Sequence, residues 1–253
     1  MKLISYNVNG IRSAINKGFV HWLKEENPDV IGLQEIKATE QDIDRSIFVD
    51  LGYELYWHPA VKKGYSGVAI FSKIKPKSIK YGMGTNKYDD EGRIIQADFD
   101  GFSFLSSYFP SGTTGDVRQD FKYEFLDDIY GYMQDLLREN QKLILSGDYN
   151  ICHKPIDIHN PISNKNSSGF LPQERAWMDK FTESGFVDTF RHFNAEAHHY
   201  SWWSYRANSR SKNLGWRIDY HMATKELQNK LKSAVILPHV NHSDHCPIVL
   251  EIE

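Results

Sequence analysis

Hydrophobic and polar positions along the chain switch between a period of two residues and a period near 3.6, so strands and helices should alternate. Short apolar or alternating runs bounded by Asn, Asp, Gly or Pro predict strands. The predicted strands cover residues 2–8, 29–34, 53–58, 67–72, 94–99, 102–109, 143–146, 200–205, 216–222 and 246–251. This alternation favours an α/β (α+β) fold class.

Apolar side chains at helical spacing predict the main helices. Apolar residues from Ile15 to Leu23 fall on one face of a first helix, which should end at residues 27–28 because Pro28 disfavours helix in the preceding residue. A long amphipathic helix covers residues 121–137, and another begins at Pro172.

The connections between these elements indicate one mixed domain. Asp100-Gly101 predicts a type I′ hairpin, so the sheet cannot be purely parallel. Residues 156–172 are rich in Asn, Ser and Pro and predict a long loop, of the kind that is usually functional or disordered. Since no linker or repeat interrupts the chain, we expect a single domain over residues 1–253, with a mixed, mostly antiparallel core and outer helices.

Composition narrows the class of protein. The 253 residues are 40% hydrophobic and 25% charged, which excludes a disordered or fibrous chain. No apolar run is long enough to span a membrane, and the polar start of the chain disfavours a signal peptide. Cys152 and Cys246 have no zinc-site spacing and fit a cytoplasmic protein. The net charge of -3 means that any polyanion site must be local.

Polar residues collect at the ends of predicted strands, where α/β folds place their sites. Taken singly, Glu35 or Asp148 is more often a turn former or helix cap, and the Ser-Asp-His run 243–245 is more often a loop. Asp219 is different, because a carboxylate inside an apolar strand is costly without a partner.

Together these residues suit the hydrolysis of a phosphate ester. Carboxylate oxygens with few sulfur ligands favour Mg²⁺ or Mn²⁺ over zinc. A buried Asp can orient a His, and the unit formed by Asp148 and Asn150 can position a water and donate to an oxyanion. The chain lacks the GxxxxGK[ST], GxGxxG and GxSxG motifs. The sequence therefore gives no support for a nucleoside triphosphatase, a dinucleotide-binding enzyme or a serine hydrolase with a nucleophile elbow.

These residues, in this order, resemble the exonuclease III / apurinic-apyrimidinic (AP) endonuclease family within the endonuclease-exonuclease-phosphatase superfamily. The matching segments are SYNVNGIR (5–12), LQEIK (33–37), GYSGVAIFSK (64–73), SYFPSG (107–112), LSGDYNICHKPIDIHNP (145–161), GFLPQER (169–175), RSKNLGWRIDY (210–220) and HSDHCPI (242–248). They span nearly the whole chain. The resemblance implies a four-layered α/β sandwich, with two mixed β-sheets packed face to face and flanking helices.

The resemblance also implies metal ligands. Glu35 would bind the metal, with Asn7 beside it and Asp244 near it. The implied cofactor is Mg²⁺, with Mn²⁺ as a possible substitute.

The remaining catalytic roles are likewise implied by the resemblance. Asp148 would align or deprotonate the attacking water, and Asn150 would hold the phosphate. Tyr108 would stabilise the transition state or leaving group. Asp219 would pair with His245, which we interpret as a donor to a phosphate oxygen rather than a base.

The segment WWSYRANSRSKNLGWR (202–217) mixes aromatic and basic residues without an acidic one, as a groove that follows a DNA backbone requires. An interior strand followed by a solvated basic turn is the alternative. The resemblance places Trp202 and Trp216 in a pocket for a flipped abasic sugar. Further candidates for DNA contact are Arg210, Lys212, Asn208, Asn213, Arg12, Lys37 and Tyr65.

Two positions depart from the family pattern. Ser111 stands where related sequences often have Asn, and the loop 112–115 has no arginine to reach into the DNA. The grip on the strand opposite the lesion should therefore differ.

The expected activity is Mg²⁺-dependent cleavage of the phosphodiester 5′ to an abasic site in double-stranded DNA. The 3′→5′ exonuclease, 3′-phosphodiesterase and 3′-phosphatase activities of the family could share the same centre. The alternatives are a phosphatase or RNase of the same superfamily and a catalytically silent DNA-binding module. The expected partners are duplex DNA with abasic sites or 3′ ends, with no membrane, and the expected state is a monomer.

Overall fold

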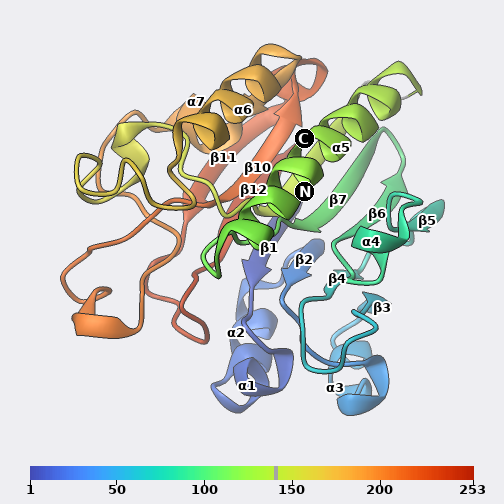
Figure 1. Cartoon of the computed structure of the whole chain (residues 1–253). Coiled ribbons are helices and arrows are strands. Elements are labelled where there is room, and N and C mark those ends of the chain that lie inside the picture. The colour runs from blue at the N-terminus through green and yellow to red at the C-terminus, as the bar shows by residue number, and fades with distance from the viewer. Residues whose placement is uncertain (140–141) are drawn as a thin grey trace.

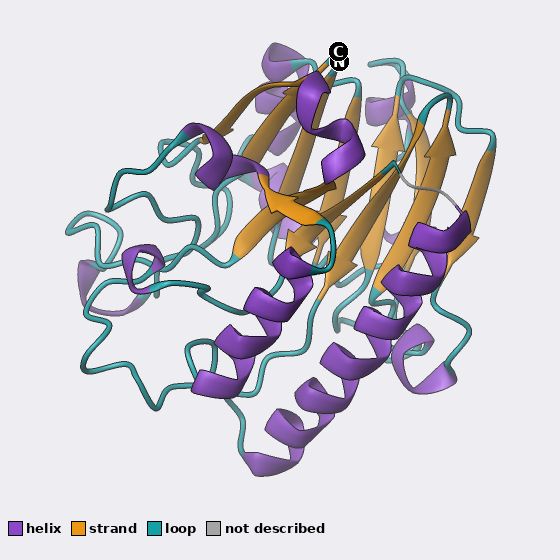
Figure 2. Cartoon of the chain, turned by 90° about the horizontal axis from the view of Figure 1, so that it is seen from above, coloured by secondary structure: helices purple, strands orange, loops and turns teal. Residues whose placement is uncertain are grey.

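The computed structural model describes residues 1–139 and 142–253, which form two six-stranded sheets packed face to face (Figures 1 and 2). The first sheet has the order β11 (Leu231–Ile236), β12 (Ile248–Ile252), β1 (Lys2–Asn7), β2 (Val30–Gln34), β4 (Val68–Ser72) and β3 (Glu54–His58). The second has the order β5 (Ser78–Tyr81), β6 (Ile94–Phe99), β7 (Phe102–Tyr108), β8 (Leu143–Asp148), β10 (Asp219–Thr224) and β9 (Phe186–Asp188).

Helices cover both outer faces. Beside the first sheet lie α1 (Ile11–Asn16), α2 (Phe19–Glu26) and α3 (Ser46–Val49), and beside the second lie α5 (Asp116–Glu139) and α6 (Pro172–Glu183). Two short helices, α4 (Asn86–Asp89) and α7 (Thr189–Phe193), complete the set of α-helices in the described residues. The layers are therefore helix, sheet, sheet and helix, and the predicted four-layered α/β sandwich is confirmed.

The sheets meet over an apolar core that contains buried polar bridges, among them the bond from Gln34 Nε2 to Ser106 Oγ at 2.9 Å. Side chains such as Leu3, Phe104 and Ile144 fill the space between the sheets. Within it, His221 of β10 accepts a hydrogen bond at Nδ1 from Ser146 Oγ at 2.6 Å. Its Nε2 donates to the main-chain oxygen of Ile248 in β12 at 3.2 Å, so the imidazole links the two sheets. Burial lowers the pKa of His221 to about 4, and the ring is neutral at physiological pH.

The mixed, mostly antiparallel character is confirmed, since the described ladders contain the parallel pairs β1–β2 and β7–β8 among antiparallel ones. The hairpin at Asp100-Gly101 is also present, with Phe99 opposite Phe102. Its predicted type is wrong. A type I′ turn needs positive φ at both loop residues, and of the two only Gly101 has it, at 88°.

Two predicted elements, the first helix and the strand over residues 200–205, are wrong. The helix expected to run through Ile15 and Leu23 is two helices, because Gly18 adopts φ 96° between α1 and α2. The strand predicted over residues 200–205 is irregular, with only isolated bridges from Trp202 to Trp216 and to His245. The long loop is confirmed beyond a short 3₁₀ turn at Pro155–Asp157.

Other strand limits shift by a few residues, and short strands were missed. The strand expected from residue 216 begins at Asp219 and continues to Thr224. The strands β5, β9 and β11 were not predicted, because β9 has three residues, β5 is a largely exposed edge strand, and β11 is a half-buried edge strand without a clear apolar period. In the described part of the chain, no helix combines the length and apolar character needed to cross a bilayer.

Candidate active site

Strand ends from both sheets meet at one edge of the sandwich. In the second sheet, Tyr108 and Asp219 are the register partners of Asp148 on either side of it. In the first sheet, Asn7 at the end of β1 lies opposite Gln34 at the end of β2, and Glu35 follows directly. Residues from distant parts of the sequence therefore converge because each comes at the end of a neighbouring strand.

Glu35 is held in a backbone conformation that is unusual for its type. Its φ is 49°, in the left-handed region, where a non-glycine residue is strained by about 1 kcal/mol. Two hydrogen bonds hold it there: Gly10 N donates to the main-chain oxygen of Glu35, and the next amide, Ile36 N, donates to Gly67 O. Its carboxylate accepts from Asn7 Nδ2 at 2.9 Å and pairs with Lys37 Nζ at 2.9 Å. Strain maintained by surrounding contacts is typical of functional positions.

Asp148 is the buried centre of the site. The preceding Gly147 has φ 143°, and a Cβ there would lie 1.8 Å from the main-chain oxygen of Ser107, so only glycine permits this close approach of β7 and β8. Asp148 Oδ2 accepts from Asn7 Nδ2 at 2.9 Å, and Oδ1 accepts from the Asn150 amide at 2.8 Å.

The surroundings of Asp148 favour its protonated form more than water does. Burial is the largest cause that raises the pKa of Asp148, and the nearby carboxylates of Asp219 and Glu35 raise it further. The charge of His245 lowers the pKa in part, and the result is a pKa of about 7.

His245 lies between two aspartates. Its Nδ1 donates to Asp219 Oδ2 at 2.9 Å, and its Nε2 is 3.7 Å from Asp148 Oδ2. Ser201 Oγ donates to the same Asp219 oxygen at 2.6 Å. Burial alone would lower the pKa of His245, but the charges of Asp219 and Asp148 outweigh it and raise the pKa to about 10. The imidazole is therefore cationic at neutral pH, as a phosphate donor should be.

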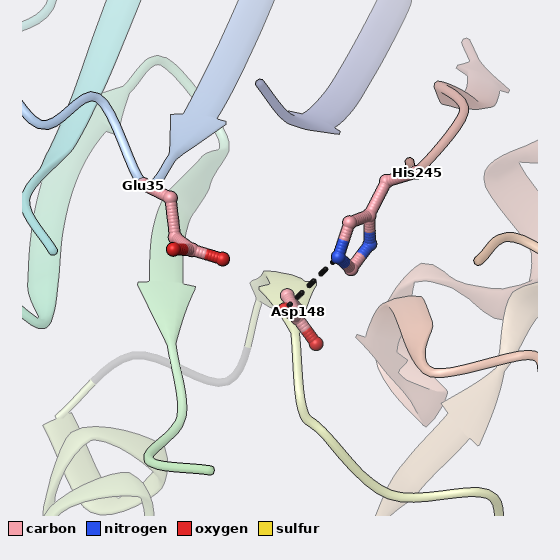
Figure 3. Close-up of side chains that lie close together, drawn as sticks. All are labelled: Glu35, Asp148 and His245. Atoms are coloured by element: carbon pink, nitrogen blue, oxygen red, sulfur yellow. Dashed lines mark ion pairs between the residues drawn. The ribbon is translucent and has the colours of Figure 1, made fainter. Parts of the chain in front are cut away.

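Two of these side chains, Glu35 and Asp148, could hold a metal ion, with His245 beside them, because a cationic imidazole has no free lone pair for a metal. Ligand atoms of Glu35, Asp148 and His245 lie within 4.8 Å of one another, and Figure 3 shows the three side chains converging on one space. Two carboxylates at such a point suit a divalent cation that prefers oxygen ligands.

The other two predicted metal ligands are close but differently engaged. Asn7 turns its amide nitrogen toward Glu35 and Asp148, and its oxygen accepts the Asn9 amide at 3.0 Å. Asp244 accepts from Asn9 Nδ2 at 2.9 Å. In this arrangement Asn7 orients the carboxylates, and its role as a ligand stays a prediction, as does that of Asp244.

Asn9 is a residue that the sequence analysis missed, although it lies inside the matched segment SYNVNGIR. It joins the two sides of the site, because its oxygen accepts from Lys37 Nζ at 2.5 Å while its nitrogen donates to Asp244. Burial alone would raise the pKa of Asp244, but His245 and the hydrogen bonds from Asn9 and Trp202 hold it below its usual range.

Tyr108 and Asn150 flank the same space. The guanidinium of Arg93, a residue only 1% exposed, lies 4.8 Å from the centre of the Tyr108 ring and donates to the Tyr108 main-chain oxygen at 2.9 Å. Burial raises the pKa of Tyr108, Glu35 adds to the rise and Arg93 reduces it, so the phenol stays protonated. Asn150 Nδ2 donates to the main-chain oxygen of Phe109 at 2.9 Å.

One cleft of about 790 Å³ is lined by Glu35, Tyr108, Asp148, Asn150, Asp244 and His245. Trp202 and Trp216 form one wall, with ring centres 6.0 Å apart at 86°, and Trp202 Nε1 donates to Asp244 Oδ2 at 3.0 Å. The rest of the lining includes Ser111 and its loop and residues 166–169 and 171, of which Gly169 lies against Trp216. None of these loop residues was predicted as a site residue, although the loop 156–172 was expected to be functional or disordered and 169–175 is one of the matching segments.

Three predicted DNA contacts lie together beside this cleft. Arg12, Lys37 and Tyr65 line a neighbouring pocket of about 300 Å³, which also contains Lys62 and Lys63. The local positive charge that a polyanion requires is therefore present, despite the negative net charge.

Arg210 was predicted to contact DNA, but its guanidinium is engaged elsewhere. It donates to the main-chain oxygens of Ser243 at 2.8 Å and Val240 at 2.5 Å. A third bond reaches Pro238 O at 3.1 Å, and the group lies 4.6 Å from the Trp203 ring centre. These carbonyls belong to the loop that carries Asp244, so in this structure Arg210 holds that loop.

The other polar residues of the segment differ among themselves. Asn213 accepts from Trp203 Nε1 at 3.1 Å and donates to His198 O at 2.9 Å, so it stabilises the loop. Asn208 and Lys212 are exposed and stay candidates for DNA contact.

Arg217 does not belong to a basic groove, contrary to the sequence analysis. It is 1% exposed and pairs with Asp157 at 2.8 Å and with Asp188 at 2.7 Å. The charge that seemed available for DNA is neutralised inside the protein.

Known proteins are similar to this chain in sequence and in fold. Residues 4–245 match the model of the Endonuclease/Exonuclease/phosphatase family. The chain belongs to this family. An exodeoxyribonuclease of Bacillus subtilis (strain 168) is 42% identical over 254 residues, covering 100% of this chain and 99% of that protein.

Solved structures of the family agree in fold. The structure of an AP endonuclease from Archaeoglobus fulgidus has a TM-score of 0.92 and 30% identity, covering 100% of this chain and 99% of that one. A 3′ phosphatase from Neisseria, bound to product DNA hairpin, has a TM-score of 0.92 and 25% identity, with the same coverage of 100% and 99%. The predicted resemblance to exonuclease III and AP endonucleases is confirmed.

Proposed function

We propose that this DNA repair nuclease hydrolyses the phosphodiester 5′ to an abasic site in duplex DNA. The products would be a 3′-hydroxyl and a 5′-deoxyribose phosphate. The observation that carries the proposal is the single cleft in which Glu35, Asp148 and His245 converge beside a wall of two tryptophans. The protein would act as a monomer, since one chain supplies all these residues.

The donor set fits a hard divalent cation, and Glu35 is the residue that would hold Mg²⁺. When bound, Mg²⁺ neutralises the phosphate and the charge that develops on it in the transition state. Mn²⁺ would substitute, because it accepts the same oxygen ligands.

Asp148 presents the attacking water. Its carboxylate is fixed by Asn7 and by the Asn150 amide, so a water bound to it would be held in one orientation. His245, kept cationic by Asp219, donates from Nε2 to a phosphate oxygen. Positioning and charge therefore supply most of the rate enhancement, as expected for phosphoryl transfer.

Tyr108 and Asn150 complete the set. The protonated Tyr108 hydroxyl can donate to the phosphate or the leaving oxygen, and the Asn150 amide lies on the other side of Asp148.

The tryptophan wall selects the substrate. A flipped sugar without a base could enter the space beside Trp202 and Trp216, whereas a base would meet these rings. The pocket at Arg12, Lys37 and Tyr65 would bind neighbouring phosphates.

The same centre could act at 3′ ends, and the similar Neisseria structure is that of a 3′ phosphatase. A phosphatase or RNase acting on other substrates is the alternative within the superfamily. A silent DNA-binding module is disfavoured, because the acidic, amide and imidazole groups are all present and converge on one point.

A gel assay tests the proposal. The purified chain with Mg²⁺ should cut a duplex that contains one tetrahydrofuran site, and EDTA should abolish the cut. RNA and p-nitrophenyl phosphate serve as competing substrates. Faster turnover of either one than of the abasic duplex would contradict the proposal.

A further inference from the structure

A buried ion pair outside the catalytic cluster joins the two outer helices. Lys122 of α5 and Glu174 of α6 have 0% exposed side chains, and Lys122 Nζ donates to Glu174 Oε1 at 2.5 Å. Replacing such a pair by apolar residues of similar shape is often neutral or stabilising. The helices also pack through apolar side chains such as Phe125 and Trp177. Stability alone therefore does not account for this pair.

Each member of the pair also holds one side of the catalytic cleft. Lys122 Nζ donates to the main-chain oxygen of Asn150 at 2.8 Å. Glu174 Oε2 accepts the amides of Gly169 at 2.7 Å and Leu171 at 2.9 Å. Asn150, Gly169 and Leu171 all line the cleft. The pair thus ties the segment after the catalytic strand to the loop that faces it.

That loop lies at contact distance from the tryptophan wall. Gly169 has φ 93°, and a Cβ there would lie 3.0 Å from Trp216 Cζ3 and 3.1 Å from the main-chain oxygen of Asn150. Its own main-chain oxygen accepts from Cys152 N at 2.7 Å. The loop cannot move further in, and the Glu174 carboxylate opposes its movement outward. The position of Gly169 therefore sets the width of the cleft at Trp216.

We propose that Glu174, buried against Lys122, is a positioning residue whose carboxylate oxygen holds the loop at Gly169 and Leu171, fixes the pocket width at Trp216 and so excludes nucleotides that carry a base. The proposal rests on the proposed function and names what determines its specificity. A pocket that excludes by shape is sensitive to small displacements of its wall. Releasing the loop should therefore admit a base while leaving the reacting groups in place.

Two double variants separate anchoring from charge. Lys122→Met/Glu174→Met removes the charges and the acceptor for the Gly169 and Leu171 amides. Lys122→Met/Glu174→Gln also removes the charges but keeps an amide oxygen that can accept from the loop. The substrates are one duplex carrying either a tetrahydrofuran or a mismatched uracil, because a mismatched base leaves the stack readily.

The Met/Met variant should raise kcat/KM for uracil relative to tetrahydrofuran by about 10-fold or more, with kcat on tetrahydrofuran within a few-fold of wild type. The Met/Gln variant should keep the wild-type ratio. A wild-type ratio in the Met/Met variant, or equal changes in both, would overturn the proposal. Incision of tetrahydrofuran by the wild type tests the proposed function separately.

A milder variant covers the case in which Met/Met does not fold, as judged by circular dichroism. Gln119 Nε2 donates to Glu174 Oε1 at 3.1 Å, and its Oε1 accepts from Ser168 Oγ at 2.7 Å. Gln119→Leu would loosen the same loop by removing these two hydrogen bonds while it keeps Lys122 and Glu174 themselves. The uracil-to-tetrahydrofuran ratio should rise about 3-fold, and an unchanged ratio would overturn the proposal.

Discussion

Asp148 and Asp219 face each other as register partners on the antiparallel strands β8 and β10, and the imidazole of His245 joins their carboxylates. Asp219 thereby pairs with the imidazole, and Asp148 lines the cleft in which the substrate would react. Two like charges at neighbouring strand ends are tolerated because a cation lies between them.

Replacing Asp148 with Asn should lower the rate of abasic-site incision by about 10³-fold or more while DNA binding is retained. Asn keeps the shape but cannot accept the proton or orient the water as a carboxylate does. Single-turnover kinetics and a binding titration measure the two effects. Turnover within a few-fold of wild type would make Asp148 a structural residue.

Replacing Asp219 with Asn should lower the pKa of His245. Burial favours the neutral imidazole, and the Asp219 charge is the largest influence that raises the pKa to about 10. NMR titration of the metal-free protein measures the change. Ser201→Ala is the control, since it removes the hydroxyl that donates to Asp219 and accepts from the Ile218 and Asp219 amides but removes no charge, and it should leave the imidazole cationic at pH 7. A pKa of His245 in Asp219→Asn as high as in the wild type would contradict this prediction.

The His221 bridge between the sheets predicts a loss of stability in acid. His221 has a pKa of about 4 when folded and 6.5 as the ordinary value, so between these values the unfolded chain binds more protons. The free energy of unfolding should therefore fall as the pH drops from about 6.5 to 4. The full contribution is about 3 kcal/mol, at about 1.4 kcal/mol per pKa unit.

Urea unfolding at several pH values checks this. His221→Gln should remove the His221 share of the pH dependence, whereas His21→Gln at an exposed position should not. Identical pH dependence in the wild type and His221→Gln would show that this imidazole does not titrate on unfolding.

Arg210→Met should lower kcat about 10-fold and leave the salt dependence of DNA binding unchanged. The guanidinium holds three carbonyls of the loop that carries Asp244, so its loss displaces that loop instead of removing a phosphate contact. Lys212→Met, at an exposed position, is the matched test of a true contact. A salt slope reduced by about one in Arg210→Met would place this arginine on the DNA.

The fold class and the catalytic cluster could be predicted because strand ends and motif residues are local features of the sequence. Glu35, Asp148 and His245 each follow or precede an apolar strand, so one pattern indicated all three. The convergence itself came from the resemblance, since strand order cannot be derived from periodicity alone.

What could not be predicted from the sequence depends on long-range partners. Arg210 and Arg217 lie in the same basic segment of the sequence. Arg210 donates to main-chain oxygens of a nearby loop, whereas the charge of Arg217 is neutralised by Asp157 and Asp188. Similarly, Lys122 falls within a predicted amphipathic helix, and nothing local shows that its ammonium is buried against Glu174. Gly18 divides the first helix because its φ is positive, which apolar spacing does not report.

The central claim is that water, positioned by Asp148, attacks the phosphorus 5′ to an abasic site. Mass spectrometry of the products formed in H₂¹⁸O from a natural abasic duplex tests it most directly. The account predicts one ¹⁸O atom in the 5′-phosphate of the deoxyribose fragment, a plain 3′-hydroxyl on the other, and neither product without a divalent metal. An unsaturated 3′ sugar end with no ¹⁸O in the phosphate would identify elimination instead of hydrolysis and contradict the account.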